Sequence, residues 1–240
     1  MTAAQKHAPV ALIVAASWDD IGVVKEILSR GDDVDEKNEN GRTALMVTIS
    51  KEIAALLISK DASLDLQDNR GATALLWAAH NNRARIVALL LENGASIDLK
   101  DNEGYTPLSW ASAYGWTDVM LLLLVKGASI DENSNEGETP LMRAADCSHP
   151  EAVRLLIEKG AALDAVDNDG KTVLERMEQR YAPTIVQILK DAHEARRRAV
   201  EVEAAVAAAE KERVRRAVVA GKQRWMKGKA SALPKPGYPS

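Results

Sequence analysis

Histidine, cysteine and serine often act as nucleophiles and bases, and here they form no catalytic set. The histidines stand at positions 7, 80, 149 and 193, and none has a serine or carboxylate at the spacing of a nucleophile and its base. Cys147 lies near His149, but catalytic partners are usually remote in a chain. The sequence also lacks the GxxxxGK(S/T), GxGxxG, HExxH and paired-cysteine motifs. It therefore predicts no enzyme, no catalytic residue, no cofactor and no metal site.

Acidic loops are the next candidates, because carboxylates followed by a glycine can bind calcium. Residues 167–170, DNDG, match part of a calcium-loop pattern. Ala165 occupies the position of the first ligand, and Arg176 occupies that of the bidentate glutamate. We therefore exclude a calcium loop at this place.

Other carboxylates recur at regular intervals. One column holds Asp35, Asp65, Asp98, Asp131 and Asp164, and a second holds Asp68, Asp101 and Asp167, with Ser134 interrupting it. The favoured interpretation is turn capping, because aspartate side chains accept hydrogen bonds from nearby backbone N–H groups. The alternative is an acidic stripe along one edge, which would select a basic partner.

The regular spacing extends to glycines and indicates an internal repeat. Glycines before a Thr-x-Leu signal stand at 41, 71, 104, 137 and 170, and a second column holds Gly31, Asp61, Gly94, Gly127 and Gly160. Both columns share one interval of 30 residues followed by three of 33. A period near 33 residues is typical of a solenoid, in which each short helix is covered by neighbouring repeats.

Residues 101–134 form the clearest copy of the unit. Thr106-Pro107 begins a short helix, Gly115 breaks it, Asp118 opens a second apolar helix, and Gly127 ends it. TPLSWA at 106–111, TPLMRA at 139–144, TALLWA at 73–78 and GASID at 94–98 and 127–131 resemble ankyrin repeats over roughly residues 8–190. The histidine that usually follows T-P-L in that family is replaced by Met46, Leu76, Ser109 and Met142, so its inter-repeat hydrogen bond is not expected here.

The resemblance implies an all-α solenoid of about six helix-turn-helix repeats with short hairpin loops. The expected repeats are 8–38, 39–68, 69–101, 102–134, 135–167 and 168–190. Repeat two lacks three residues between its helices, which predicts a shortened first helix and an altered rim. Its Asp61 replaces the terminating glycine and should keep the left-handed conformation. Residues 8–16, APVALIVAA, are interpreted as the first helix of repeat one, with a signal peptide as the alternative.

The charge is distributed unevenly along the chain. Residues 1–190 hold 19 basic and 29 acidic side chains, whereas residues 191–240 hold 12 and 6. Apolar residues recur at alternating steps of three and four from Ile185 to Ala209, which predicts a long helix continuing repeat six, with residues 191–220 as a charged, Ala-rich part. A coiled-coil dimer is the alternative, but the mostly Ala and Val seam favours a monomer. Residues 221–240, basic and rich in Pro and Gly, are expected to be disordered.

Ankyrin-like repeats bind proteins through their hairpin tips and first-helix surface, so the resemblance implies a partner-binding site there. The candidate residues are Asn69, Arg70, His80, Asn81, Asn102, Glu103, Tyr105, Tyr114, Trp116, Asn135, Glu136, Glu138 and Asp146. Tyr105 and Tyr114 are the expected anchors, since interfaces are rich in aromatic residues. Trp77 and Trp110 share a column and are expected to pack, with Arg143 over the Trp110 ring.

These observations favour a non-enzymatic scaffold or adaptor with a protein partner, possibly basic. The alternatives are nucleic-acid or anionic-surface binding through the basic tail, where residues 213–235 hold eight basic side chains and no acid, or a translocated effector. A single cysteine fits a reducing compartment, so a cytoplasmic location is expected, and secretion or translocation stays open. No run approaches 18 apolar residues, so no membrane span is expected.

Overall fold

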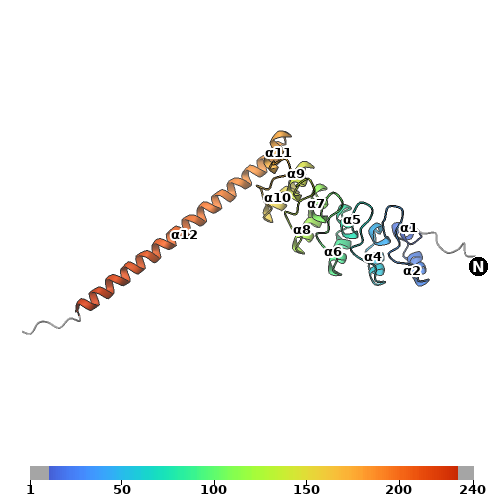
Figure 1. Ribbon diagram of the computed structural model, residues 1–240, viewed down its shortest axis with the longest axis horizontal. Helices are drawn as coiled ribbons and strands as arrows, with labels where there is room; N and C mark the ends of the chain where they lie inside the picture. Colours follow the sequence, from blue (N-terminus) through green and yellow to red (C-terminus); the bar gives the residue numbers. More distant parts are fainter. Residues whose placement is uncertain (1–10, 232–240) are drawn as a thin grey trace, which may run out of the picture. The chain divides into compact units, whose positions relative to one another are not determined.

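The structure, a computed structural model, describes residues 11–231. By their contacts, residues 1–190 form one compact unit, called unit one, and residues 191–240 form another, called unit two. The described part is helical (Figure 1). Its helices are α1 (Ala11–Ser17), α2 (Ile21–Ser29), α3 (Ala44–Val47), α4 (Lys51–Ile58), α5 (Ala74–His80), α6 (Ala84–Glu92), α7 (Pro107–Ala113), α8 (Thr117–Val125), α9 (Pro140–Asp146), α10 (Pro150–Glu158), α11 (Val173–Gln179) and α12 (Pro183–Ser231).

The helices of unit one form two layers. Each of α1, α3, α5, α7 and α9 contacts the next member of its row, ending at α11, and α2, α4, α6, α8 and α10 form the second row (Figure 1). Leu57, Leu90, Leu123 and Leu156 form one column of the core, each with 0% of its surface exposed. These leucines are 33 residues apart, so the period predicted from the sequence is also the period of the core. Burial of each leucine side chain contributes about 1.5–3 kcal/mol.

Threonine hydroxyls begin most first helices. The side chains of Thr73, Thr106, Thr139 and Thr172 each accept a hydrogen bond from the backbone N–H three residues later. Such a cap contributes about 1 kcal/mol because it satisfies a donor that the helix itself leaves free. These caps fix the start of α5, α7, α9 and α11, and therefore the direction in which each first helix leaves its hairpin.

The second helices end in left-handed residues, as predicted. Gly127 has φ of 95°, and no atom lies within 4 Å of the place where its Cβ would be. Backbone conformation rather than lack of space therefore favours glycine at this position. Asp61 has φ of 62°, which confirms that aspartate keeps the terminator of repeat two.

Four carboxylates of the first acidic column accept hydrogen bonds from backbone N–H groups, as the favoured interpretation predicts, but the donors lie in the following repeat and not in the nearby turn. The carboxylates of Asp35, Asp65, Asp98 and Asp131 accept from the backbone N–H groups of Ser63, Ser96, Ser129 and Ala162, at 3.0, 2.9, 3.1 and 2.9 Å. The column therefore ties neighbouring repeats together. This use of the carboxylates argues against the alternative of an acidic stripe kept for a partner.

The three-residue deletion in repeat two shortens its first helix, as predicted. Helix α3 is a single turn, Ala44–Val47, where the equivalent helices have seven residues. Arg83 of the next repeat compensates: its Nη1 donates to the carbonyl oxygen of Thr48 at 2.8 Å. The altered rim leaves a cleft of about 520 Å³ that Ile49, Lys51 and Arg83 help to line.

Helix α12 is longer than the sequence indicates. Its first turns bury Ile185, Ile188 and Leu189, whereas every side chain described from residue 197 onward is exposed. The helix continues through residues 221–231, so the prediction that this part is disordered was wrong. The prolines on which that prediction depended stand at 234, 236 and 239, after the last residue of the helix. The rest of the expected disordered segment, 232–240, lies outside the described residues. Within residues 11–231 no helix is long and apolar enough to cross a membrane.

Candidate partner-binding surface

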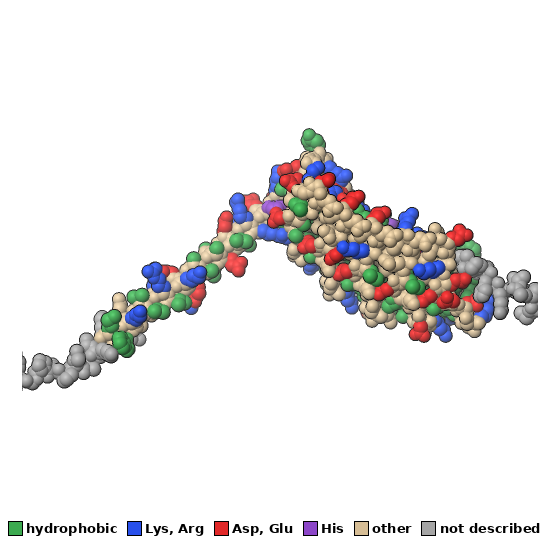
Figure 2. Space-filling view, viewed as in Figure 1, with side chains coloured by type: hydrophobic (Ala, Val, Ile, Leu, Met, Phe, Trp, Pro, Cys, Tyr) green, Lys and Arg blue, Asp and Glu red, His purple; other side chains and the backbone are tan. Residues whose placement is uncertain are grey.

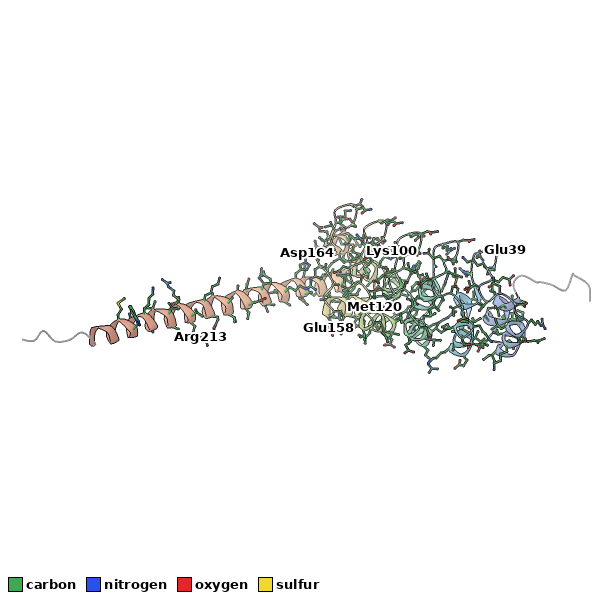
Figure 3. The ribbon with its side chains drawn as sticks, turned by 60° about the horizontal axis from the view of Figure 1, so that its bottom comes forward. Glu39, Lys100, Met120, Glu158, Asp164 and Arg213 are labelled. Carbon is green, nitrogen blue, oxygen red and sulfur yellow. The ribbon has the colours of Figure 1, made fainter. Side chains whose placement is uncertain are left out.

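The hairpin asparagines hold neighbouring repeats in register. The Nδ2 atoms of Asn69, Asn102, Asn135 and Asn168 donate to the carbonyl oxygens of Glu39, Asn69, Asn102 and Asn135, at 2.9, 3.1, 2.9 and 2.9 Å. Glu39 lies among these loops in Figure 3. The side-chain amides of the predicted tip residues Asn69, Asn102 and Asn135 therefore form hydrogen bonds within the fold. Only the solvent-exposed sides of these asparagines remain available to a partner.

The second acidic column positions the aromatic side chains of the first helices. At the hairpin that leads into repeat four, Asp101 Oδ1 accepts from the backbone N–H groups of Glu103 and Tyr105, at 3.0 and 2.9 Å. Its Oδ2 accepts from Trp110 Nε1 at 2.9 Å. Asp68 and Trp77 repeat this last contact at 3.0 Å. The indoles are thus fixed to the hairpins, which confirms that Trp77 and Trp110 pack, although both remain half-buried.

Five rings gather along α5 and α7 and in the turn after α7. We call Trp77, His80, Trp110, Tyr114 and Trp116 the aromatic cluster. The His80 ring lies 5.4, 5.0 and 4.8 Å from the ring centroids of Trp77, Trp110 and Tyr114. Tyr114 stacks between Trp110 and Trp116, at 6.1 and 6.2 Å with interplanar angles of 16° and 8°. The two repeats therefore present one continuous aromatic surface.

Two contacts keep the aromatic cluster rigid. Trp116 Nε1 donates to the His80 carbonyl oxygen at 3.0 Å, and Arg42 lies over the Trp77 ring at 3.9 Å. Tyr114 nevertheless has 41% of its surface exposed. His80 Nδ1 is buried and has no hydrogen-bond partner among the described residues. The structure thus brings the predicted residues His80, Tyr114 and Trp116 together, and adds Trp77 and Trp110 to them.

Tyr105 is not the exposed anchor that the sequence predicts. Its side chain is buried, its hydroxyl donates to Glu138 Oε2 at 2.9 Å, and its ring meets Trp110 edge-on. Burial and the bond to Glu138 raise the pKa of Tyr105 to about 12. The residue after the hairpin glycine is buried in repeats three, four and five, as Ala72 and Glu138 also show. A small alanine at the position equivalent to Tyr105 was the signal in the sequence that this position faces inward.

Arg143 contacts a different ring from the one predicted. Its guanidinium lies 4.5 Å from the centroid of the Tyr105 ring, and Nη1 lies 3.6 Å from Glu138 Oε2. Ser134 explains the shift, since its one oxygen already accepts from the backbone N–H groups of Glu136 and Glu138, both at 3.2 Å. Ser134 lacks the second oxygen with which Asp68 and Asp101 accept from the indole N–H groups of Trp77 and Trp110.

Repeats five and six carry a buried ion-pair network instead of rings. Arg176 Nη2 contacts Glu138 Oε1 at 2.6 Å and Asp146, and Nη1 contacts Asp167 Oδ2 at 2.8 Å. Burial alone would raise the pKa of Glu138, but hydrogen bonds from Arg176 and Tyr105 outweigh it and hold that pKa below its usual value. Two predicted partner-binding residues, Glu138 and Asp146, are therefore paired with Arg176 inside the repeats, with side chains only 8% and 9% exposed.

The remaining predicted residues are exposed. They are Arg70, Asn81, Glu103 and Glu136. Together with Asp169, the residue equivalent to Glu136 in repeat six, Glu103 and Glu136 make the tips of repeats four to six acidic. A polar cleft of about 510 Å³ lies beside Glu136 and Asp169. In residues 11–231 no group of three or more His, Cys, Asp or Glu side chains is placed to hold a metal ion.

Comparison with known proteins identifies the family. A family model described as ankyrin repeats (3 copies) matches residues 12–101, 50–134 and 93–167. The fold is similar to that of an ankyrin repeat domain from Acinetobacter baumannii AYE, with 29% identity, a TM-score of 0.69, and coverage of 77% of this chain and 98% of that one. It is equally similar to the ankyrin repeat protein EF0377, with 30% identity, a TM-score of 0.69 and the same coverage. Proteins of this kind are in general protein–protein interaction modules. With its two-layered helical repeats and these matches, the chain belongs to the ankyrin repeat family.

Proposed function

We propose that this protein is a non-enzymatic scaffold or adaptor that binds a partner protein through the hairpin tips and first-helix ends of repeats three and four. The aromatic cluster carries this proposal. Its rings are held by Asp68, Asp101 and the His80 carbonyl, and Tyr114 remains 41% exposed. Rigid, partly exposed aromatic rings are the usual anchors of interfaces, because little side-chain entropy is lost when a partner covers them.

The exposed charges on the tips of repeats four to six favour a partner with a basic segment. Glu103, Glu136 and Asp169 stand on successive tips, all three are exposed, and the described ion pairs do not use them. Arg70, on the tip of repeat three, marks where the acidic edge ends. Complementary charges of this kind affect the association rate and the choice of partner more than the affinity.

The test uses the full chain as bait and Tyr114→Ala as the variant. Proteins captured by the wild type are identified by mass spectrometry, and the affinity of each for wild-type and variant chains is measured by calorimetry. We expect Tyr114→Ala to weaken the binding of the authentic partner at least tenfold, since removal of an interface hot spot costs about 2 kcal/mol or more.

Tyr181→Ala is the matched control. Tyr181 is 90% exposed in the equivalent turn of repeat six, outside the aromatic cluster, so its loss should leave the affinity within twofold. A partner that binds Tyr114→Ala as tightly as the wild type would place the interface elsewhere. A partner that binds the Tyr114 and Tyr181 variants equally weakly would point to a loss of folding, which circular dichroism of both variants detects.

A further inference from the structure

Unit two carries an apolar stripe on a helix with many basic side chains, and two further exposed apolar side chains, Val219 and Met226, lie outside the stripe. Val214, Ala217, Val218, Gly221 and Trp225 follow the spacing i, i+3, i+4, i+7 and i+11 on α12. At roughly 100° per residue they fall within an arc of about 100°. Val214, Val218 and Trp225 are 52%, 56% and 63% exposed. Hydrophobic, basic and acidic side chains are interspersed along this helix in Figure 2.

Basic side chains flank the stripe on both sides. Arg213, labelled in Figure 3, projects from one edge, and Arg215 and Lys222 from the other, at roughly 80–100° from Val214. From Arg213 to the end of the chain there is no acidic residue. Arg213 and Arg216 pair with Glu210 and Glu212 at 3.0 and 2.9 Å. Those arginines are 79% and 80% exposed, so the pairs contribute little and can be exchanged for other anions.

We propose that residues 211–226 of α12 bind the surface of an anionic lipid bilayer. An apolar arc between basic edges is the arrangement with which a helix lies in the lipid–water interface, with its apolar side among the acyl chains and its cations at the phosphates. Tryptophan favours this interface because its ring is apolar and its N–H is polar. This lipid-binding segment lies outside the repeats and is independent of the partner-binding function proposed above.

A nucleic acid fits the segment less well. Phosphate contacts would use Arg213, Arg215, Arg216 and Lys222, but most of the stripe between them would stay in water, because apart from Trp225 it offers Val, Ala and Gly where base stacking needs aromatic rings. A second copy of the helix is also a poor occupant, since both copies carry the same positive charge and the stripe is built mostly of small side chains. An anionic membrane covers the apolar arc and neutralises both edges at once.

The experiment is co-sedimentation of the full chain with vesicles of phosphatidylcholine containing about one third phosphatidylglycerol. Neutral phosphatidylcholine vesicles and a DNA duplex are the parallel arms. The wild type should partition to the anionic vesicles and hardly to the neutral ones. We expect Val218→Ser with Trp225→Ser to reduce the partition coefficient at least tenfold, because the interfacial apolar area is lost. Arg213→Gln with Arg215→Gln should reduce it by a similar factor, since each basic residue near an anionic surface contributes roughly fivefold.

Val200→Ser with Val202→Ser is the matched control, because both valines lie on α12, 65% and 63% exposed, next to Glu201 and Glu203. It should leave partition within twofold of the wild type. Failure of the wild type to sediment with anionic vesicles at low salt overturns the proposal. So does partition that the serine variants leave unchanged. Duplex binding that depends on the arginines and is accompanied by no vesicle binding would assign the segment to nucleic acid.

Discussion

Arg176 is the residue on which the largest group of buried charges depends. Its guanidinium contacts Glu138, Asp146 and Asp167, whose side chains are 8%, 9% and 7% exposed. Arg176→Met keeps much of the side-chain volume but leaves three carboxylates without this counter-charge. We expect the free energy of unfolding to fall by about 2–3 kcal/mol, somewhat less than for a fully enclosed pair because Arg176 is 18% exposed. Urea unfolding followed by circular dichroism measures the change.

The pH dependence of that loss distinguishes charge from packing. In the wild type, the lowered pKa of Glu138 gives a stability that is present above its unfolded pKa and disappears as the pH falls through the lowered value. The Arg176→Met variant loses the hydrogen bond that lowers the pKa of Glu138 most, so less of this stability is present in the variant at neutral pH. The difference between the two proteins should therefore be largest near pH 7 and shrink below about pH 4. A difference independent of pH would attribute the loss to packing. Arg180→Met, at a 57% exposed position, is the control and should cost less than about 1 kcal/mol.

At the scale of elements, repeat two depends on a side chain supplied by repeat three. Helix α3 ends after one turn, and Arg83 Nη1 donates to the Thr48 carbonyl at 2.8 Å; burial lowers the pKa of Arg83. Arg83→Ala should destabilise the protein by about 1–2 kcal/mol, because a charged donor is lost and a part-buried carbonyl is left without it. Arg85→Ala, an exposed neighbour on α6, should change the unfolding midpoint little. Equal midpoints for the two variants would show that α3 needs no such cap.

The elements were predictable from the sequence because the repeat imposes its own register. Two glycine columns with one shared deletion give every helix pair, including the short α3 and the left-handed Asp61. Side-chain directions were not predictable from one repeat at a time, because their partners lie in the next. Tyr105 is buried by Glu138, 33 residues later, and Arg143 is redirected because Ser134 lacks the second oxygen of aspartate. A comparison of equivalent positions, such as Asp68–Trp77 and Asp101–Trp110, would have predicted the hydrogen bonds between aspartate and indole. It would not have predicted that Arg143 contacts the Tyr105 ring.

At the scale of the whole molecule, the two units contribute differently to stability. The fully buried leucines and the inter-repeat hydrogen bonds lie in residues 11–190, whereas the side chains described from residue 197 onward are exposed. Helix α12 forms ion pairs there such as Arg197–Glu201 and Arg216–Glu212, which contribute about 0.2–0.5 kcal/mol each. An exposed helix without tertiary contacts melts gradually, because its stability comes from propensity rather than from packing.

Removal of residues 191–240 should therefore leave the cooperative unfolding of the repeats unchanged. The urea midpoint and the m-value of residues 1–190 should equal those of the full chain, since m scales with the surface exposed on unfolding, while the helical signal at 222 nm decreases. A chain ending at residue 166 is the contrasting variant. It lacks α11, with the buried side chains of Val173 and Met177, and the ion pairs of Arg176, so its midpoint should fall. A lower midpoint for residues 1–190 would instead mean that residues 191–240 also stabilise the repeats.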